Sequence, residues 1–302
     1  MVDWLAGKRA KGTSSERTGL GTPLAFTDTT VSKTGVKVYY NFEQTSGSLT
    51  NIATTGNGFS DGLGSSLDAT VTGSPTRTTT GKLGSYATTG VNGAYFTLPN
   101  TSGNSSLAFL SNSSFSLSFW IKKASSGVGV IISSASGSGA WSGYNLSIDP
   151  SSGNISYFRR ASNGGAPYGE QVSYSGAITD TDWHHVVVTG TGSSGNAKLY
   201  IDGSEKTFSI NYSDSMSGSA YHQSNLTLFG YGSSFVGTNS ESEHTLDEFV
   251  IFNRTLSSAE ASTLYDEQAL GVPNTQDGTI FEETDTNKAY IWSSSSQTWT
   301  QL

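Results

Sequence analysis

Residues 115–123 read FSLSFWIKK, and this short stretch decides the fold class of the 302-residue chain. Apolar and polar side chains alternate along most of it. Because successive side chains of a β-strand point to opposite faces, such a strand turns one apolar face toward a core. The stretch therefore predicts a strand of an antiparallel β-sandwich. The core-facing side chains would be Phe115, Leu117, Phe119 and Ile121.

Further strand-like stretches lie on the C-terminal side of this one. In one of them, Asp202-Gly203 separates two strand patterns, which is typical of a two-residue type I′ hairpin turn because both positions need positive φ. A looser turn is expected at DPSSGN, residues 149–154. The chain is thus predicted to be all-β. The additional strands are expected within residues 128–134, 144–160, 183–191, 197–210 and 225–232.

The composition of the chain limits its function classes. Only 13% of residues are charged and the net charge is −8, so the basic surface that binds nucleic acid is missing. The absence of cysteine excludes disulfides, a thiol nucleophile and cysteine-ligated zinc. No apolar stretch approaches the ~20 residues of a membrane-spanning helix, and the basic N-terminal stretch is not followed by the apolar region of a secretory signal. We expect neither a nucleic-acid partner nor a membrane span.

One helix is expected after the strand at residues 246–252. Ser257, with Glu260 three residues later, fits a capping box, and Leu256 is placed to act as a hydrophobic staple. Leu264 and Tyr265 would then pack back on the sandwich.

The two ends of the chain differ from its strand-rich middle. Residues 1–34 are basic and show no strand-length alternation, so we expect an arm that contacts neighbouring subunits. Residues 271–302 are predicted to be a linker and three short strands, which must pack on the main domain, a sister chain or a ligand, since so small a meander is marginal alone. Residues 35–270 would form the sandwich. The candidate assembly residues are Trp4, Lys8, Arg9, Lys11 and Arg17 in the arm, and Trp292 and Trp299 in the tail.

Several stretches, taken together and in order, resemble a known family. VYYNFEQTSGSLTN, FSLSFWIK, WHHVVVT, KLYIDG and LDEFVIFNRTLSSAE are similar to successive segments of the concanavalin A-like, laminin-G-like jelly-roll domain. The resemblance implies two antiparallel sheets packed face to face. It also implies binding of glycans or proteins, sometimes through a calcium ion, with glycosidases or lyases in some branches.

The ends of the chain carry a second resemblance. The tail DGTIFEETDTNKAYIWSSSSQTWTQL looks like a short β module of phage and viral surface and tail proteins. The opening DWLAGKRAKGTSSER is similar to the start of certain virion proteins. Together they imply a component of a virus particle.

The glycosidase branch of this fold places carboxylates at alternate positions of one strand, in the pattern Glu-x-Asp-x-Glu, about 5 Å apart in retaining enzymes. The best match is ETDTN, residues 283–287, which lacks the last carboxylate and lies in a predicted turn. Serine-nucleophile, zinc-protease and phosphate-loop motifs are also missing. We therefore expect a protein that is not an enzyme.

A calcium site is the main candidate for a metal. In calcium-binding members of the family, an Asp at the position of Asp247 can join an oxygen from the loop that contains Asn51, and hard oxygen ligands suit Ca²⁺. Asn at position 51 removes a charge from that pattern. In the alternative interpretation, Asp247 caps a turn or pairs with Arg254 and Asn51 forms an Asx-turn.

Aromatic residues in predicted loops are the candidates for stacking on sugar rings, since these rings present apolar faces. The alternative is that each aromatic side chain simply packs on its own loop. The candidate glycan-binding residues are Trp141, Tyr144, Tyr168 and Tyr231.

The adjacent His184 and His185 suggest a metal or acid/base pair. In a strand they would point to opposite faces and could not act together. We expect one to be semi-buried with a hydrogen-bond partner and the other to lie nearer solvent.

Three functions remain open at this stage. The first is a non-enzymatic structural or surface protein of a virion, whose partners are other copies of itself, other virion proteins, and host-surface glycans or proteins. The second is a free, calcium-assisted glycan-binding adhesin on the surface of a prokaryote. The third is a polysaccharide-degrading enzyme, which needs a carboxylate pair on one face of a sheet.

Overall fold

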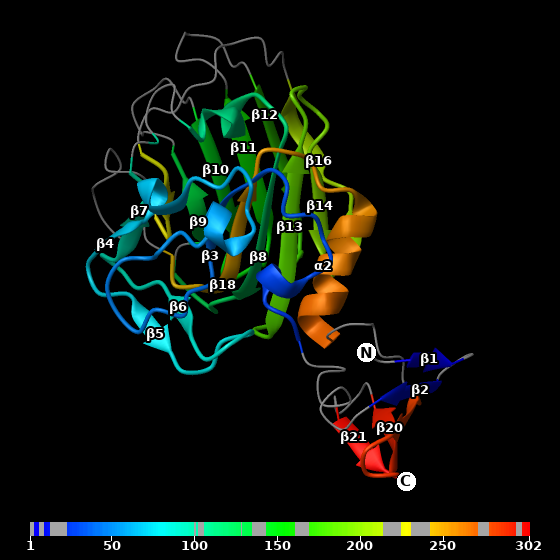
Figure 1. Ribbon diagram of the computed structural model, residues 1–302. Helices are drawn as coiled ribbons and strands as arrows, with labels where there is room; N and C mark the ends of the chain where they lie inside the picture. The colour runs from blue at the N-terminus through cyan, green and yellow to red at the C-terminus, as the bar shows by residue number, and fades with distance from the viewer. Residues whose placement is uncertain are drawn as a thin grey trace. The chain divides into compact units, whose positions relative to one another are not determined.

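The computed structural model describes residues 3–5, 9–12, 23–99, 101, 106–127, 129–134, 143–160, 169–213, 225–230, 242–270, 278–293 and 298–302. It contains two compact units. The sandwich domain comprises Ser32–Ala261, and the terminal unit comprises Met1–Val31 with Ser262–Leu302. Apart from one α-helix and short 3₁₀ helices, the regular elements of the described residues are β-strands, so the predicted all-β class is confirmed (Figure 1).

The sandwich domain consists of two antiparallel sheets that share one hydrophobic core. In the described part of the chain each sheet has eight strands. The first sheet has the order β16 (Ser209–Ser213), β12 (Gly169–Tyr174), β11 (Ile155–Arg160), β10 (Gly143–Ile148), β9 (Val130–Ser133), β17 (Thr227–Leu228), β7 (Tyr95–Thr97), β4 (Thr70–Thr72).

The second sheet lies on the other side of this core. Its order is β15 (Ser204–Lys206), β14 (Lys198–Ile201), β13 (Trp183–Gly190), β8 (Phe115–Lys122), β18 (Thr245–Phe252), β6 (Ala87–Thr89), β5 (Thr76–Thr78), with β3 (Val36–Tyr40) paired to β18. Short 3₁₀ helices interrupt the connections of the domain. They are η2 (Thr55–Asn57), η3 (Gly64–Leu67) and η4 (Ala108–Ser111).

Strand β8 has the predicted core face, and its other face is buried as well. The four predicted side chains all belong to the core. On the opposite face, Trp120 is 1% exposed and Ser118 is 2% exposed. Ser116 Oγ accepts a hydrogen bond of 2.8 Å from the Leu256 backbone N–H. The sequence pattern identified the core side correctly but did not show that the hydroxyls and the indole of the other side are also enclosed.

The predicted turns follow from local backbone chemistry. Asp202 and Gly203 have φ of 50° and 73°, as a type I′ turn requires. In the 149–154 turn, Asp149 Oδ1 accepts hydrogen bonds from the backbone N–H groups of Ser151 and Ser152. Both turn predictions are confirmed.

The predicted helix is α2 (Ser258–Leu270). The Ser257 backbone N–H donates to Glu260 Oε2 at 2.9 Å, and the Glu260 backbone N–H donates to Ser257 Oγ at 3.2 Å. This reciprocal pair is the predicted capping box.

The terminal unit joins both ends of the chain in one sheet. Its order is β1 (Asp3–Leu5), β2 (Arg9–Gly12), β19 (Ile280–Glu283), β20 (Ala289–Ser293), β21 (Thr298–Gln301), and β2 runs parallel to β19. The unit also contains η1 (Phe26–Asp28). The sequence instead predicts a separate arm, residues 1–34, and a separate meander within residues 271–302. A three-stranded meander is marginal alone, and here two strands from the N-terminal segment extend it.

Candidate functional site

The first sheet carries a row of polar residues and one phenylalanine, one from each strand except the edge strand β16. Residues directly opposite each other in antiparallel strands point to the same face. We call this set the polar row. It consists of Gln171, Phe158, Asn145, Ser133, Thr227, Thr97 and Thr70, of which Asn145, Ser133 and Thr227 are buried.

The polar row faces away from the hydrophobic core. The residues that alternate with it along the central strands belong to the core, so the row must lie on the outer face. Those core residues are Tyr144, Leu146, Tyr157 and Val172. A second outward row runs parallel to it, and across β10, β11, β12 and β16 it is made of serines. It consists of Ser147, Ser156, Ser173 and Ser209.

Asn145 lies near the centre of the polar row and is 4% exposed. Its Nδ2 is buried and has no hydrogen-bond partner in the described part of the chain. A buried polar group without a partner costs about 1–3 kcal/mol, so such groups are normally satisfied by protein, water or ligand. Phe158, directly opposite, and Gln171 beyond it are half-buried. An amide donor beside an aromatic ring and a second amide matches the hydroxyls and apolar faces of a sugar.

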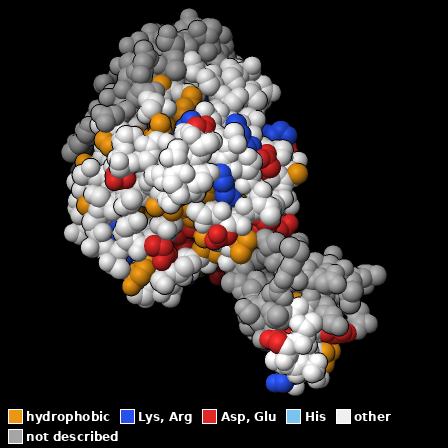
Figure 2. All heavy atoms as spheres, in the orientation of Figure 1, with side chains coloured by type: hydrophobic (Ala, Val, Ile, Leu, Met, Phe, Trp, Pro, Cys, Tyr) orange, Lys and Arg blue, Asp and Glu red, His pale blue; other side chains and the backbone are white. Residues whose placement is uncertain are grey.

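The strands of the first sheet contain one carboxylate among the described residues, and it points inward. Glu170 is 1% exposed, and its Oε1 accepts a 2.6 Å hydrogen bond from Arg159 Nε. Arg159 also donates to the backbone carbonyls of Ser113 and Thr191, while Glu170 Oε2 accepts from the Gly195 N–H at 2.7 Å. This buried ion pair fixes β11 and β12 in register below the polar row. Figure 2 shows several small, separate groups of basic and acidic side chains on the visible face of the described sandwich domain.

The four predicted glycan-stacking residues have different outcomes. Trp141, Tyr168 and Tyr231 lie outside the described residues. Tyr144 is fully buried, and its ring packs against Phe115 with centroids 5.5 Å apart, so it is not an exposed platform and that prediction is corrected. Burial raises the pKa of the Tyr144 hydroxyl well above its ordinary value. Tyr144 lies within β10 and alternates into the core, so it cannot also belong to a loop surface.

Both polar atoms of the Asn51 side chain form hydrogen bonds with backbone groups inside the sandwich domain. Its Oδ1 accepts from the backbone N–H groups of Tyr39 and Ala53, and its Nδ2 donates to the carbonyls of Lys37 and Gly64. The amide is 1% exposed. The predicted role of the Asn51 side chain as a calcium ligand is therefore corrected: it ties β3 to the loops beside it, and its contact with the Ala53 N–H is that of an Asx-turn.

Asp247 also has a structural environment. Its Oδ2 accepts a 2.9 Å hydrogen bond from the Leu83 N–H and its Oδ1 accepts one from the Glu248 N–H. Burial, with the neighbouring Glu248 carboxylate, raises the pKa of Asp247 well above its ordinary value. Among the described residues no group of three or more His, Asp or Glu side chains is arranged to hold a metal ion. Calcium binding through Asp247 stays a prediction.

The two histidines lie in separate environments, as expected. His185 is 1% exposed, its Nε2 lies 2.9 Å from Ser118 Oγ, and burial lowers its pKa to about 3. His184 lies opposite Ile121, on the other face, with Nδ1 2.7 Å from Asp202 Oδ2. They form neither a metal site nor an acid/base pair.

The predicted assembly residues belong to the terminal sheet or lie outside the described residues. Trp4 is in β1, and Arg9 and Lys11 are in β2, but their side chains are not described; Lys8 and Arg17 lie outside the described residues. Trp292 is 3% exposed and its ring lies 5.3 Å from that of Trp299. The two tail tryptophans thus form a small core with each other within the terminal unit.

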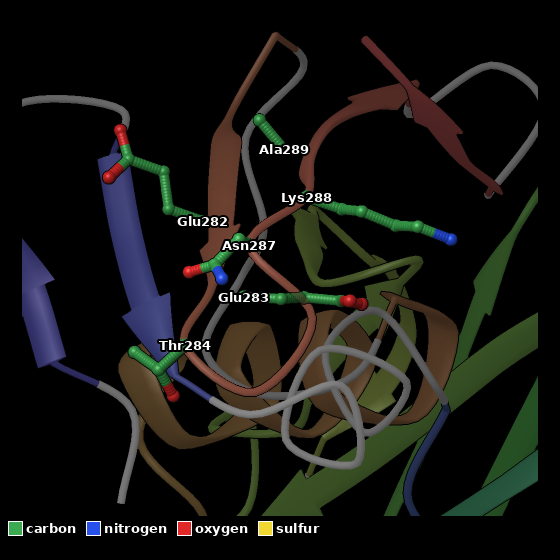
Figure 3. A pocket seen from close by; sticks show the side chains of 6 residues that line it. All are labelled: Glu282, Glu283, Thr284, Asn287, Lys288 and Ala289. Carbon is green, nitrogen blue, oxygen red and sulfur yellow. The ribbon is translucent and has the colours of Figure 1, made fainter.

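The ETDTN sequence forms the hairpin turn between β19 and β20, as predicted. A shallow hollow of about 360 Å³ lies beside it, lined by the end of the hairpin (Figure 3). The carboxyl groups of Glu282 and Glu283 point away from each other in this view. Glu283 is 4% exposed and accepts a hydrogen bond from Thr286 Oγ1. This arrangement does not bring two carboxylates to one substrate.

Comparison with known proteins places the chain in a family. Residues 89–262 match the laminin-G-type family model described as the Concanavalin A-like lectin/glucanases superfamily. The match covers more than half of the chain. The sandwich is therefore a concanavalin A-like jelly roll, and the chain belongs to the concanavalin A-like lectin/glucanases superfamily. No curated protein matches the chain.

Solved structures with the same fold include binding domains of botulinum neurotoxins. One is the binding domain of botulinum neurotoxin DC in complex with rat synaptotagmin II, with 15% identity and a TM-score of 0.51 over 78% of this chain and 52% of that one. Another, for botulinum neurotoxin type C, is described as dependent on two ganglioside molecules for cell entry, with 16% identity, a TM-score of 0.51, and coverage of 78% and 51%. The chain spans about half the length of these structures, and the likeness is one of fold.

The polar row is not predicted from the sequence alone. Its signal is present as alternation: Asn145 and Ser147, Ser156 and Phe158, Gln171 and Ser173 occupy the positions between core residues of three successive strands. The cross-strand register that aligns them is a long-range property that a single sequence does not give.

Proposed function

We propose that the sandwich domain is a non-enzymatic binding module that recognises a carbohydrate through the polar row. The observation that carries the proposal is the buried, unpartnered Nδ2 of Asn145 beside Phe158 and Gln171 on the outer face of the first sheet. A sugar hydroxyl would accept the hydrogen bond that Asn145 lacks. Membership of a superfamily of lectins and glucanases supports a carbohydrate as the ligand.

The described strands of the first sheet favour binding over hydrolysis. A glycosidase needs two carboxyl groups on the face that holds the sugar. Glu170, the one carboxylate in the described strands of this sheet, points into the core and is held by Arg159. The polar row offers amides, hydroxyls and an aromatic ring, which bind without supplying a proton or a nucleophile.

The test is a glycan array probed with the full chain, in parallel with the variants Phe158→Ala and Gln171→Ala. We expect wild-type binding that persists in EDTA and falls in both variants. Ser209→Ala, on the outward serine row at the edge strand, is the matched control and should bind like wild type. Absence of glycan binding, or equal binding by all four proteins, would overturn the proposal.

For the chain as a whole we propose a structural or surface component of a virion, which displays the sandwich domain toward host-surface glycans or proteins. The resemblance of the two ends to virion proteins supports this role. Their pairing in one sheet, as a compact unit distinct from the sandwich domain, fits an attachment module that contacts other copies or other virion proteins. Mass spectrometry of purified particles should find the chain in them, and its absence from particles would contradict the role.

A free prokaryotic adhesin is the second candidate, since binding through the polar row needs no particle. It places the chain in the cell-surface fraction instead of particles. If binding is calcium-assisted, Asp247→Ala and EDTA should both abolish it, whereas binding through the polar row alone withstands EDTA. Among the described residues, no helix is long and apolar enough to cross a membrane.

A further inference from the structure

A second concave site lies at the open edge of the sandwich, away from the polar row. It is a cleft of about 250 Å³ between β14 and β15 of the second sheet and β12 and β16 of the first. We call it the edge cleft. Its lining includes four apolar side chains and three charged ones. These are Val172, Ala197, Phe208 and Ile210, and Lys198, Glu205 and Lys206.

The floor of the edge cleft is an extension of the hydrophobic core. Val172 is 1% exposed, and Phe208 is 9% exposed with its ring stacked 6.4 Å from that of Tyr157. Ile210 lies opposite Val172 in the sheet, so it points to the core face of the edge strand β16. The core does not enclose it, and it is 58% exposed. The core is therefore open to solvent at this edge.

One wall of the edge cleft is held rigidly. The Gly195 backbone N–H donates to Glu170 Oε2 at 2.7 Å, and Glu170 is itself bound to the buried Arg159. A pre-formed wall lowers the ordering cost of binding. The opening is a stable feature of the fold, held by the same ion pair that fixes β11 and β12.

The rim of the edge cleft is more positive than the chain around it. Lys198 pairs with Glu205 at 3.2 Å, and Lys206 adds a second positive charge, so two cations stand against one anion. The whole chain, in contrast, has a net charge of −8. Charge complementarity therefore favours an acidic group beside whatever enters the apolar floor.

We propose that the edge cleft is a docking site for an extended acidic peptide segment of a partner protein, which inserts one aliphatic side chain between Phe208 and Ile210 and places a carboxylate near Lys206. The volume suits a side chain better than a drug-sized ligand, since ligand pockets usually span about 300–1,000 Å³. This site is independent of the polar row and of carbohydrate binding.

The probe is a capped pentapeptide, Asp-Thr-Leu-Thr-Asp, titrated into the ¹⁵N-labelled full chain and followed by NMR. We expect saturable shifts confined to the amides of residues 195–198 and 205–210, with a dissociation constant on the order of 1 mM. The matched peptide Asp-Thr-Ser-Thr-Asp should leave these amides unchanged. Shifts of equal size with the serine peptide, or no shifts at several millimolar peptide, would overturn the proposal.

Two variants locate the interaction. Ile210→Thr keeps a β-branched residue on the strand but removes apolar surface, and should weaken binding at least about threefold. Lys206→Glu should weaken binding of the aspartate peptide and favour a peptide with lysine in place of both aspartates. Leu302→Ser, which alters the other large exposed apolar side chain of the described residues, at 64% exposure, is the control and should bind like wild type. The spectrum is also recorded without peptide at several protein concentrations. If the same amides shift with protein concentration, the edge cleft binds a second copy of this chain, and the proposal is overturned.

Discussion

Replacing Glu170 by Gln should destabilise the sandwich domain far more than its small change in shape suggests. Glu170 and Arg159 are 1% and 0% exposed, and they form an ion pair of 2.6 Å inside the sandwich. Glu170 also accepts hydrogen bonds from the Gly195 N–H at 2.7 Å and the Tyr157 hydroxyl at 3.3 Å. Glutamine keeps the volume but leaves the guanidinium charge without its counter-charge.

The expected loss of unfolding free energy is about 3–5 kcal/mol, the range for breaking a buried ion pair by removing one partner. The lower end of this range is expected, because Arg159 retains hydrogen bonds to the carbonyls of Ser113, Thr191 and Ser193. The matched control is the same change at Glu205, whose side chain is 45% exposed and whose partner Lys198 is 53% exposed. Exposed pairs of this kind contribute about 0–1 kcal/mol.

The assay is urea unfolding of the full chain at pH 7, followed by circular dichroism, with equal m values required for each comparison. We expect Glu170→Gln to shift the midpoint strongly and Glu205→Gln to leave it nearly unchanged. If both variants lie within about 1 kcal/mol of wild type, the buried pair does not hold β11 and β12 as described.

Two further predictions concern local contacts. Hydrogen bonds to Asp202, and more weakly to Asp180, raise the pKa of His184 from 6.5 to about 9. Because the pKa is higher in the folded state than in the unfolded state, protonation of His184 stabilises the fold. This contribution is complete below pH 6.5 and is lost as the pH rises through 9. Unfolding measured from pH 6 to 10 should show this decline in wild type and not in His184→Ala, and parallel curves would refute it. Gly153→Ala should cost more than about 1 kcal/mol in the urea assay, because φ is 67° and a Cβ would lie 1.7 Å from the Ile178 carbonyl oxygen; a neutral alanine would refute that.

Local chemistry explains which parts of the fold the sequence predicts well. The alternation in β8, the positive φ of Asp202-Gly203 and the capping box of Ser257 and Glu260 each depend on a few neighbouring residues. These features were predicted correctly because the physical cause lies within the segment itself. The family resemblance then supplied the arrangement of the sheets, which the family match supports.

Long-range pairing explains what the sequence did not predict. The parallel pairing of β2 with β19 joins segments that are more than 260 residues apart, and no local pattern marks it. The sequence around Tyr144 suggests an aromatic residue in a loop, but the register of β10 places it opposite Arg159, on the core face. The family resemblance suggests Asn51 as a metal ligand, but in the structure its side chain is hydrogen-bonded to four backbone groups.

The most direct test of the central claim is a joint measurement on Asn145→Leu: its binding on the glycan array and its free energy of unfolding. Leucine fills the same space but removes the buried Nδ2 that has no partner in the described part of the chain. Because an unsatisfied buried donor costs about 1–3 kcal/mol, stability should stay equal or rise. Carbohydrate binding should fall at least about tenfold, since leucine lacks the Nδ2 donor that would bind a sugar hydroxyl. A variant that binds as well as wild type, or that loses stability and binding together, would contradict the account.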